Sequence, residues 1–260
     1  MFKILGICLG SWSLSFAYIT KNNDDIIIEK LHKIVHNGNP QKYLTEYLTE
    51  NYSNEINIIA TGRKFRKILN IDNISETEAA EYAISYLIKK YNYPKLDAIA
   101  SLGAETFLVY GLDSEQHIKN VNAKNKCASG TGEFFLQQLK RMNISLEEAM
   151  TFDNNFTPYK VSGRCSVFCK SDCTHALNIG VAKNKIVLGL TSMIADKIIE
   201  LLPHNLQSNV FIVGGVSKNK LVIDFLKRVY PNCIIPQEAD YFEAIGAGLY
   251  GLKKHTSPEY

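Results

Sequence analysis

Three short apolar-rich segments, separated by glycine or polar turns, open the chain, and this pattern returns near residue 95. The first set of predicted strands covers 3–8, 13–20 and 26–35, and the second covers 96–102, 107–112 and 118–122. Short apolar-rich runs between glycine or polar turns are typical of strands in a hairpin meander. The chain therefore predicts two related α/β halves, 1–95 and 96–240, and we expect the last segment, 241–260, to join the first half.

Between and after these strands the apolar spacing changes to that of helices. In the segment 77–91, for example, Ala80, Ala83, Ile84 and Leu87 form one stripe. The predicted helices cover 41–51, 77–91, 132–142, 146–151, 167–178, 185–202 and 241–254, with further strands at 56–61 and 210–213. Strands alternating with helices indicate the α/β class.

Composition and charge limit the classes of function that the chain can have. The chain has 260 residues with 46% hydrophobic content, enough for a large core, and its net charge of +3 is spread along the sequence. We therefore expect no nucleic-acid partner. The opening segment, 1–10, has one basic residue and a short apolar run, which fits neither a signal peptide nor a membrane span. The prediction is a cytoplasmic protein with no membrane association.

Cysteine supplies the most specific chemistry. The segments 126–133 and 163–173 carry four of the six cysteines, and Cys127 and Cys165 each stand at the start of a predicted helix. Thiols at helix N-termini lose their proton readily, and thiolates bind iron or zinc. In a cytosolic chain this usage favours metal binding or redox work over disulfides, although either cysteine could also be a small buried apolar residue.

We expect the other four cysteines to pack in the protein core. Cys169 and Cys173 share one helix face with i, i+4 spacing, and His175 lies two residues further on. A zinc site from these residues is conceivable, but one straight helix cannot wrap four ligands around a tetrahedral metal. Cys8 and Cys233 lie in apolar strand contexts and are expected in the core.

Four glycine-bearing turns fall at the ends of predicted strands. They lie at 6–10, 101–105, 130–132 and 214–219. A single turn of this kind supplies a positive φ and little else, but the order of these four in two meander-led halves resembles the actin, heat-shock ATPase and sugar-kinase (ribonuclease H-like) superfamily. No P-loop sequence is present. The resemblance implies a nucleotide cleft between the halves.

Adding the cysteine segments narrows the resemblance to the activators of 2-hydroxyacyl-CoA dehydratases and the related benzoyl-CoA reductase ATPase subunits, the BadF/BadG/BcrA/BcrD type. The segment Asn125-Lys126-Cys127-Ala128-Ser129-Gly130-Thr131-Gly132 is similar to that family's Lys-Cys-Ala-Ala-Gly-Thr-Gly, and Arg164-Cys165-Ser166-Val167-Phe168 to its second cysteine segment. The late Gly-Gly-Val-x-x-Asn turn also fits. The resemblance covers essentially the whole chain.

The resemblance implies a homodimer that shares one 4Fe-4S cluster, with Cys127 and Cys165 as the ligands from each chain. It implies ATP or ADP with Mg²⁺ as further cofactors. A ferredoxin or flavodoxin would supply a low-potential electron, and a dehydratase-like or reductase-like iron–sulfur enzyme would receive it under anaerobic conditions. The residues expected to bind nucleotide are Gly10, Ser11, Gly103, Gly130, Thr131, Gly132, Gly214, Gly215 and Asn219.

The chain departs from the family in the carboxylates that serve hydrolysis. The first turn normally carries aspartate where this chain has Cys8, and the second carries two aspartates where it has Ser101 and Thr106. Mg²⁺ prefers oxygen ligands, and a thiol replaces them poorly. Glu105 is the carboxylate left in the second turn, so we expect it to be the catalytic residue of a weak ATPase.

Three alternatives stay open. A non-hydrolysing, nucleotide-gated iron–sulfur binding module would explain both the cysteines and the missing carboxylates. A sugar kinase would need a catalytic aspartate near Ser101 or Thr106 and is less favoured. A structural zinc protein is favoured least.

Overall fold

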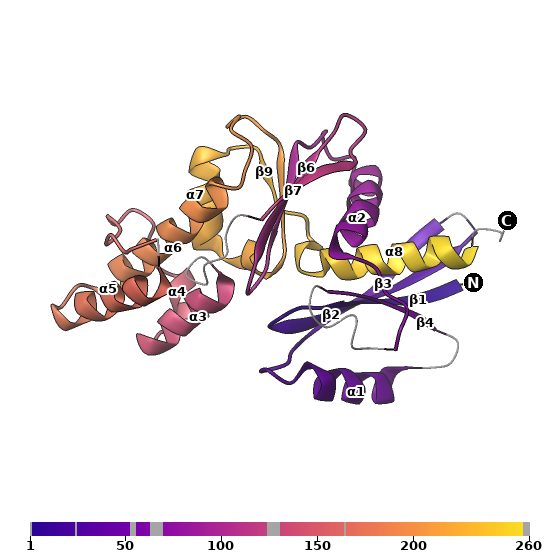
Figure 1. The fold of residues 1–260 in the computed structure, drawn as a ribbon, viewed down its shortest axis with the longest axis horizontal. Coiled ribbons are helices and arrows are strands. Elements are labelled where there is room, and N and C mark those ends of the chain that lie inside the picture. The colour runs from indigo at the N-terminus through magenta and orange to yellow at the C-terminus, as the bar shows by residue number, and fades with distance from the viewer. Residues whose placement is uncertain are drawn as a thin grey trace. The chain divides into compact units, whose positions relative to one another are not determined.

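The computed structural model describes residues 2–23, 25–52, 56–62, 70–123, 131–163 and 165–256, the side chain of Thr256 excepted. The chain divides into two compact units, which Figure 1 shows as a ribbon. Unit 1 comprises residues 1–94 and 240–260, and unit 2 comprises residues 95–239. The last helix therefore belongs with the N-terminal sheet.

Unit 1 is built on a four-stranded sheet in the order β3-β2-β1-β4, in which β1 pairs antiparallel with β2 and parallel with β4. A β-bulge at Tyr18/Ile19 interrupts the pairing of β2 with β3. The elements of this unit are β1 (Phe2–Leu9), β2 (Ser13–Asn22), β3 (Asp25–Val35), α1 (Pro40–Asn51), β4 (Asn57–Thr61), α2 (Glu76–Tyr91) and α8 (Phe242–Thr256).

Helices cover both faces of this sheet (Figure 1). Alternate residues of a strand point to opposite faces. Leu5, Ile7 and Phe16 pack toward Tyr47 of α1, whereas Ile4 and Ala17 share a core with α8 on the other face. Because both faces are buried, β1 is apolar along nearly its whole length.

Unit 2 repeats the arrangement with one more strand, in the order β7-β6-β5-β8-β9. The strand β5 pairs antiparallel with β6 and parallel with β8. The strands are β5 (Ala98–Leu102), β6 (Phe107–Leu112), β7 (Ile118–Asn122), β8 (Val210–Val213) and β9 (Cys233–Ile234). The helices are α3 (Gly132–Arg141), α4 (Leu146–Met150), α5 (Ser166–Asn178), α6 (Lys183–Ile199) and α7 (Lys220–Val229), and a 3-10 helix spans Gly215–Lys218.

One core joins the helices of unit 2 to its sheet. Phe135 of α3, Ile194 of α6 and Leu226 of α7 pack with Ala100 of β5 and Ile212 of β8. Within the described part of the chain, no helix is long and apolar enough to cross a membrane.

Two elements of unit 2 are missing from the predicted list of elements: α7 and β9, although we expected Cys233 of β9 in an apolar strand context. The side chain of Asn219 accepts a hydrogen bond from Val222 N at 3.2 Å and so caps α7. Its apolar residues Leu221, Val222 and Leu226 are buried. We expected only a turn here, because the helix begins directly after the glycine-rich segment, and β9 is too short to give a periodic signal.

Candidate nucleotide turns and cysteine centre

Three chain segments that we expected to bind nucleotide meet where β5 and β8 of the unit 2 sheet end. The strands β5 and β8 are parallel neighbours with Ser101 opposite Val213, so the turns after them begin side by side. The start of α3 lies against both turns. A Cβ placed on Gly132 would lie 2.8 Å from Val216 Cγ2 and 3.4 Å from Gly103 O.

Hydrogen bonds fix the turn between β5 and β6. Gly103 N donates to Thr106 O at 3.0 Å, and Glu133 N in the first turn of α3 donates to Ala104 O at 3.0 Å. Thr131 Oγ1 accepts from Phe134 N at 3.3 Å and caps α3. The start of α3 and the turn that carries Glu105 are therefore held together by a backbone hydrogen bond. Glu105 itself is exposed.

The turn after β8 requires glycine at its first position. Gly214 has a φ of 85°, and a Cβ there would lie 2.6 Å from Leu102 O. Gly214 N donates to Ala239 O at 2.8 Å, and the exposed Gly215 begins the 3-10 helix. Glycine turns of this kind can present backbone N–H groups to a phosphate.

Ser217 in this turn is a residue that we did not single out from the sequence. Its side chain is buried, and its hydroxyl has no hydrogen-bond partner among the described residues. Buried hydroxyls without a partner are rare and often mark a ligand position. Its place directly after Gly-Gly-Val could have pointed to it.

In unit 1 the expected residues Gly10 and Ser11 form the turn between β1 and β2. Gly10 N donates to Ser13 O at 3.1 Å. The buried His36, directly after β3, holds the turn, since its Nε2 lies 3.1 Å from Gly10 O while its Nδ1 accepts from Gly38 N at 3.2 Å. These contacts require the neutral tautomer with the proton on Nε2.

Cys8, which stands where the family has aspartate, is half-buried at the end of β1 beside the α8 core. Burial raises the pKa of its thiol well above the usual value, and the carboxylates of Glu243 and Glu76 raise it further. The thiol is therefore protonated at neutral pH and carries no charge with which to attract a metal ion.

Cys165 is the N-cap residue of α5, half-buried, and its side chain makes no capping hydrogen bond. Val167 and Phe168, in the first turn of this helix, are large apolar residues that are 69% and 64% exposed. Cys127 and Gly130 lie outside the described residues.

Cys169 and Cys173 are buried in the unit 2 core. A hydrogen bond to Cys173, together with burial, raises the pKa of the Cys169 thiol, so this pair packs as a neutral donor with its acceptor. Nowhere in the described ranges do three or more histidine, cysteine, aspartate or glutamate side chains gather in a group that could hold a metal ion.

The two sheets, each a three-stranded meander continued by a parallel strand, define the actin-like ATPase fold. Residues 62–251 match the BadF/BadG/BcrA/BcrD ATPase family, and the chain belongs to it. Membership of this ATPase family implies binding of ATP or ADP and Mg²⁺.

Named relatives agree with this assignment. The activator of lactoyl-CoA dehydratase from Anaerotignum propionicum is 28% identical, over 96% of this chain and 97% of its own length. The 2-hydroxyisocaproyl-CoA dehydratase activator of Clostridioides difficile is 26% identical, over 95% of this chain and 94% of its own length. The structure of the activator of the 2-hydroxyisocaproyl-CoA dehydratase from Clostridium difficile with bound ADPNP superposes with a TM-score of 0.80 at 22% identity, over all of both chains.

Proposed function

We propose that this protein is an ATP-dependent activator that passes a low-potential electron to a dehydratase-like or reductase-like iron–sulfur enzyme. Relatives along nearly the whole chain are named as activators of 2-hydroxyacyl-CoA dehydratases, which supports the activator role. The observation that carries the electron-transfer part is the position of Cys165, a half-buried thiol at a helix N-terminus beside two exposed apolar residues.

The surroundings of Cys165 suit a metal centre shared between two copies of the chain. Four cysteine ligands hold a 4Fe-4S cluster, so Cys165 and Cys127 of two chains would complete the set. The N-terminus of α5 favours negative charge, as on a thiolate-bound cluster. Val167 and Phe168 provide apolar surface that a second copy would cover. A bound cluster supplies one-electron chemistry.

For the nucleotide, we propose that the glycine turns of both units hold the phosphates of ATP or ADP with Mg²⁺, including Gly10, Ser11, Gly103, Thr131, Gly132, Gly214 and Gly215, with Gly130 by family resemblance. Asn219 caps α7 at the end of the turn that follows β8, and it would border the nucleoside. In this proposal Glu105 orients the attacking water, and an upstream ferredoxin or flavodoxin supplies the electron.

A separate observation supports a second candidate function, that of a non-hydrolysing module. The protonated Cys8 thiol offers no charge where the family has aspartate. A non-hydrolysing module, in which bound nucleotide only gates the cluster, needs no such charge. The two candidates differ in ATP turnover and agree on the cluster.

Anaerobic reconstitution with iron and sulfide tests the shared part. We expect about four irons per two chains, with the characteristic visible absorption of an iron–sulfur cluster and a dimer by light scattering. Cys165→Ala should lose the bound iron, because it removes two of the four ligands of a shared cluster. The matched control is Cys233→Ala, which removes a thiol buried in β9 and should retain the iron.

Normal iron content in Cys165→Ala would contradict the proposed ligand. Iron held by a monomer would contradict the shared cluster and leave the family assignment intact.

A further inference from the structure

A row of polar side chains crosses the unit 1 sheet beneath the start of α8. Strand pairing sets Cys8 of β1 opposite Ser15 of β2 and Thr61 of β4, and sets Ser15 opposite Lys33 of β3. Directly opposed residues share a face of the sheet, and Cys8 packs with the α8 core. Lys33, Ser15, Cys8 and Thr61 therefore lie in one row on the α8 side. They stand at the strand ends that lead into the Gly10 turn.

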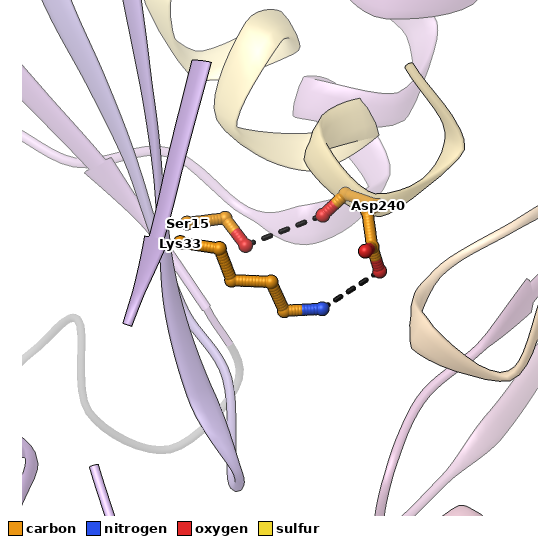
Figure 2. A network of polar contacts seen from close by, with 3 residues as sticks. All are labelled: Ser15, Lys33 and Asp240. Atoms are coloured by element: carbon orange, nitrogen blue, oxygen red, sulfur yellow. Dashed lines mark hydrogen bonds and ion pairs between the residues drawn. The ribbon is translucent and has the colours of Figure 1, made fainter. Parts of the chain in front are cut away.

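Asp240, the first residue of unit 1 after the chain returns from unit 2, contacts two residues of this row, Lys33 and Ser15 (Figure 2). Its Oδ1 lies 2.7 Å from Lys33 Nζ, and its carbonyl oxygen accepts from Ser15 Oγ at 3.2 Å. The Asp240 side chain is 2% exposed and that of Lys33 is 25% exposed. The carboxylate is therefore held inside the unit, while the ammonium keeps access to solvent.

Thr61 gives an independent sign that this row faces a ligand. Its side chain is fully buried, and its hydroxyl has no hydrogen-bond partner among the described residues. Leaving a buried hydroxyl unpaired costs about 1–3 kcal/mol, so such groups normally have a partner. The Thr61 hydroxyl and the Lys33 ammonium offer hydrogen-bond donors of the kind that a phosphate group requires, while the Ser15 hydroxyl donates to Asp240 O.

Cys8 in the middle of the row brings no charge, so the cation of the row is Lys33, and the neighbouring carboxylates are those of Asp240 and, acting on Cys8, of Glu243 and Glu76. We propose that Lys33 binds a phosphate group of the nucleotide, and that Asp240 is a positioning residue that holds the Lys33 ammonium until nucleotide replaces it. This inference rests on the proposed ATP binding and names residues for it that neither the glycine turns nor the family motifs include.

Different effects of two variants on nucleotide affinity test the inference. Lys33→Met should weaken binding of both ATP and ADP about tenfold or more, because it removes a charge-assisted contact to phosphate. Asp240→Asn keeps the size of the side chain and removes the competing charge, so ATP and ADP should bind about as tightly as before or more tightly. AMP should respond much less to both changes, because it carries less phosphate charge. Calorimetry with each nucleotide measures the three affinities.

The matched control is Lys254→Met, which breaks a different ion pair of unit 1, Lys254 Nζ to Asp72 Oδ2 at 2.6 Å. It should leave all affinities unchanged. The double variant Lys33→Asp with Asp240→Lys restores a pair if either single variant folds poorly, and it should bind ATP more weakly than the unmodified protein.

Unchanged ATP affinity in Lys33→Met would overturn the inference while the proposed function stands. Weaker binding in Asp240→Asn would overturn the positioning role, since both variants would then act alike. If the unmodified protein binds no nucleotide, the proposed function itself fails and this inference with it.

Discussion

Glu105 stands in the tight turn between β5 and β6, exposed and held by the hydrogen bond from Gly103 N to Thr106 O. The same turn accepts a hydrogen bond from the first turn of α3, so its backbone is fixed on two sides. A carboxylate on a fixed turn can orient water or a metal shell, and positioning of this kind decides the rate of phosphoryl transfer.

At this position we expect Glu105→Gln to lower ATP turnover by about 10²-fold and to leave ATP affinity nearly unchanged. The amide keeps the shape of the side chain and loses its charge. Phosphate release and calorimetry measure the two quantities. Glu115→Gln, in the exposed turn between β6 and β7, is the control and should behave as the unmodified protein.

Equal turnover in Glu105→Gln and the unmodified protein would contradict the catalytic role. Absence of turnover in both, even with a partner enzyme present, would favour the non-hydrolysing module.

At the scale of elements, close approach of backbones holds α8 in unit 1. A Cβ on Gly246 would collide with the carbonyl oxygen of Ala79 in α2, and one on Gly6 of β1 would collide with that of Ala244 in α8. The helix therefore sits tightly against both α2 and the sheet, with its first turn over the polar row. The sequence predicted this helix, but the elements against which it packs could not be predicted from local sequence.

We expect Gly246→Ala to lower the free energy of unfolding by about 1–3 kcal/mol or more, because the helix must shift to admit one methyl group. Urea unfolding followed by circular dichroism measures it. The control is Gly38→Asn, where a Cβ would meet no atom within 4 Å and asparagine tolerates the positive φ. A Gly246→Ala variant as stable as the unmodified protein would show that α8 is not held by this contact.

The sequence predicts elements well where periodicity is long and poorly where it is short. The apolar-rich runs between turns locate β1, β2 and β3 to within two residues, and the apolar stripe locates α2 equally well. The α7 helix was missed because its cap, Asn219, ends a segment that we took as turn only. Local pattern does not separate a helix N-cap from a turn, since both favour asparagine.

For the whole molecule, the repeat of a three-stranded meander followed by a parallel strand made the fold predictable. The expected nucleotide-binding residues could be listed only where they lie in one motif, as in the turn from Gly214 to Asn219, and their role stays a prediction. The contact of Lys33 with Asp240 joins residues 207 positions apart and depends on the register of three strands. No short-range pattern encodes such a contact, because the tertiary fold brings the two charges together.

The central claim is that nucleotide acts on an iron–sulfur centre at Cys165. The most direct measurement is the rate at which bathophenanthroline removes iron from the anaerobically reconstituted protein without nucleotide, with MgATP and with AMP. If nucleotide binding rearranges the chains around a shared cluster, MgATP should change that rate several-fold and AMP should not. Identical rates in all three conditions, from a protein that holds iron and binds ATP, would contradict the claim.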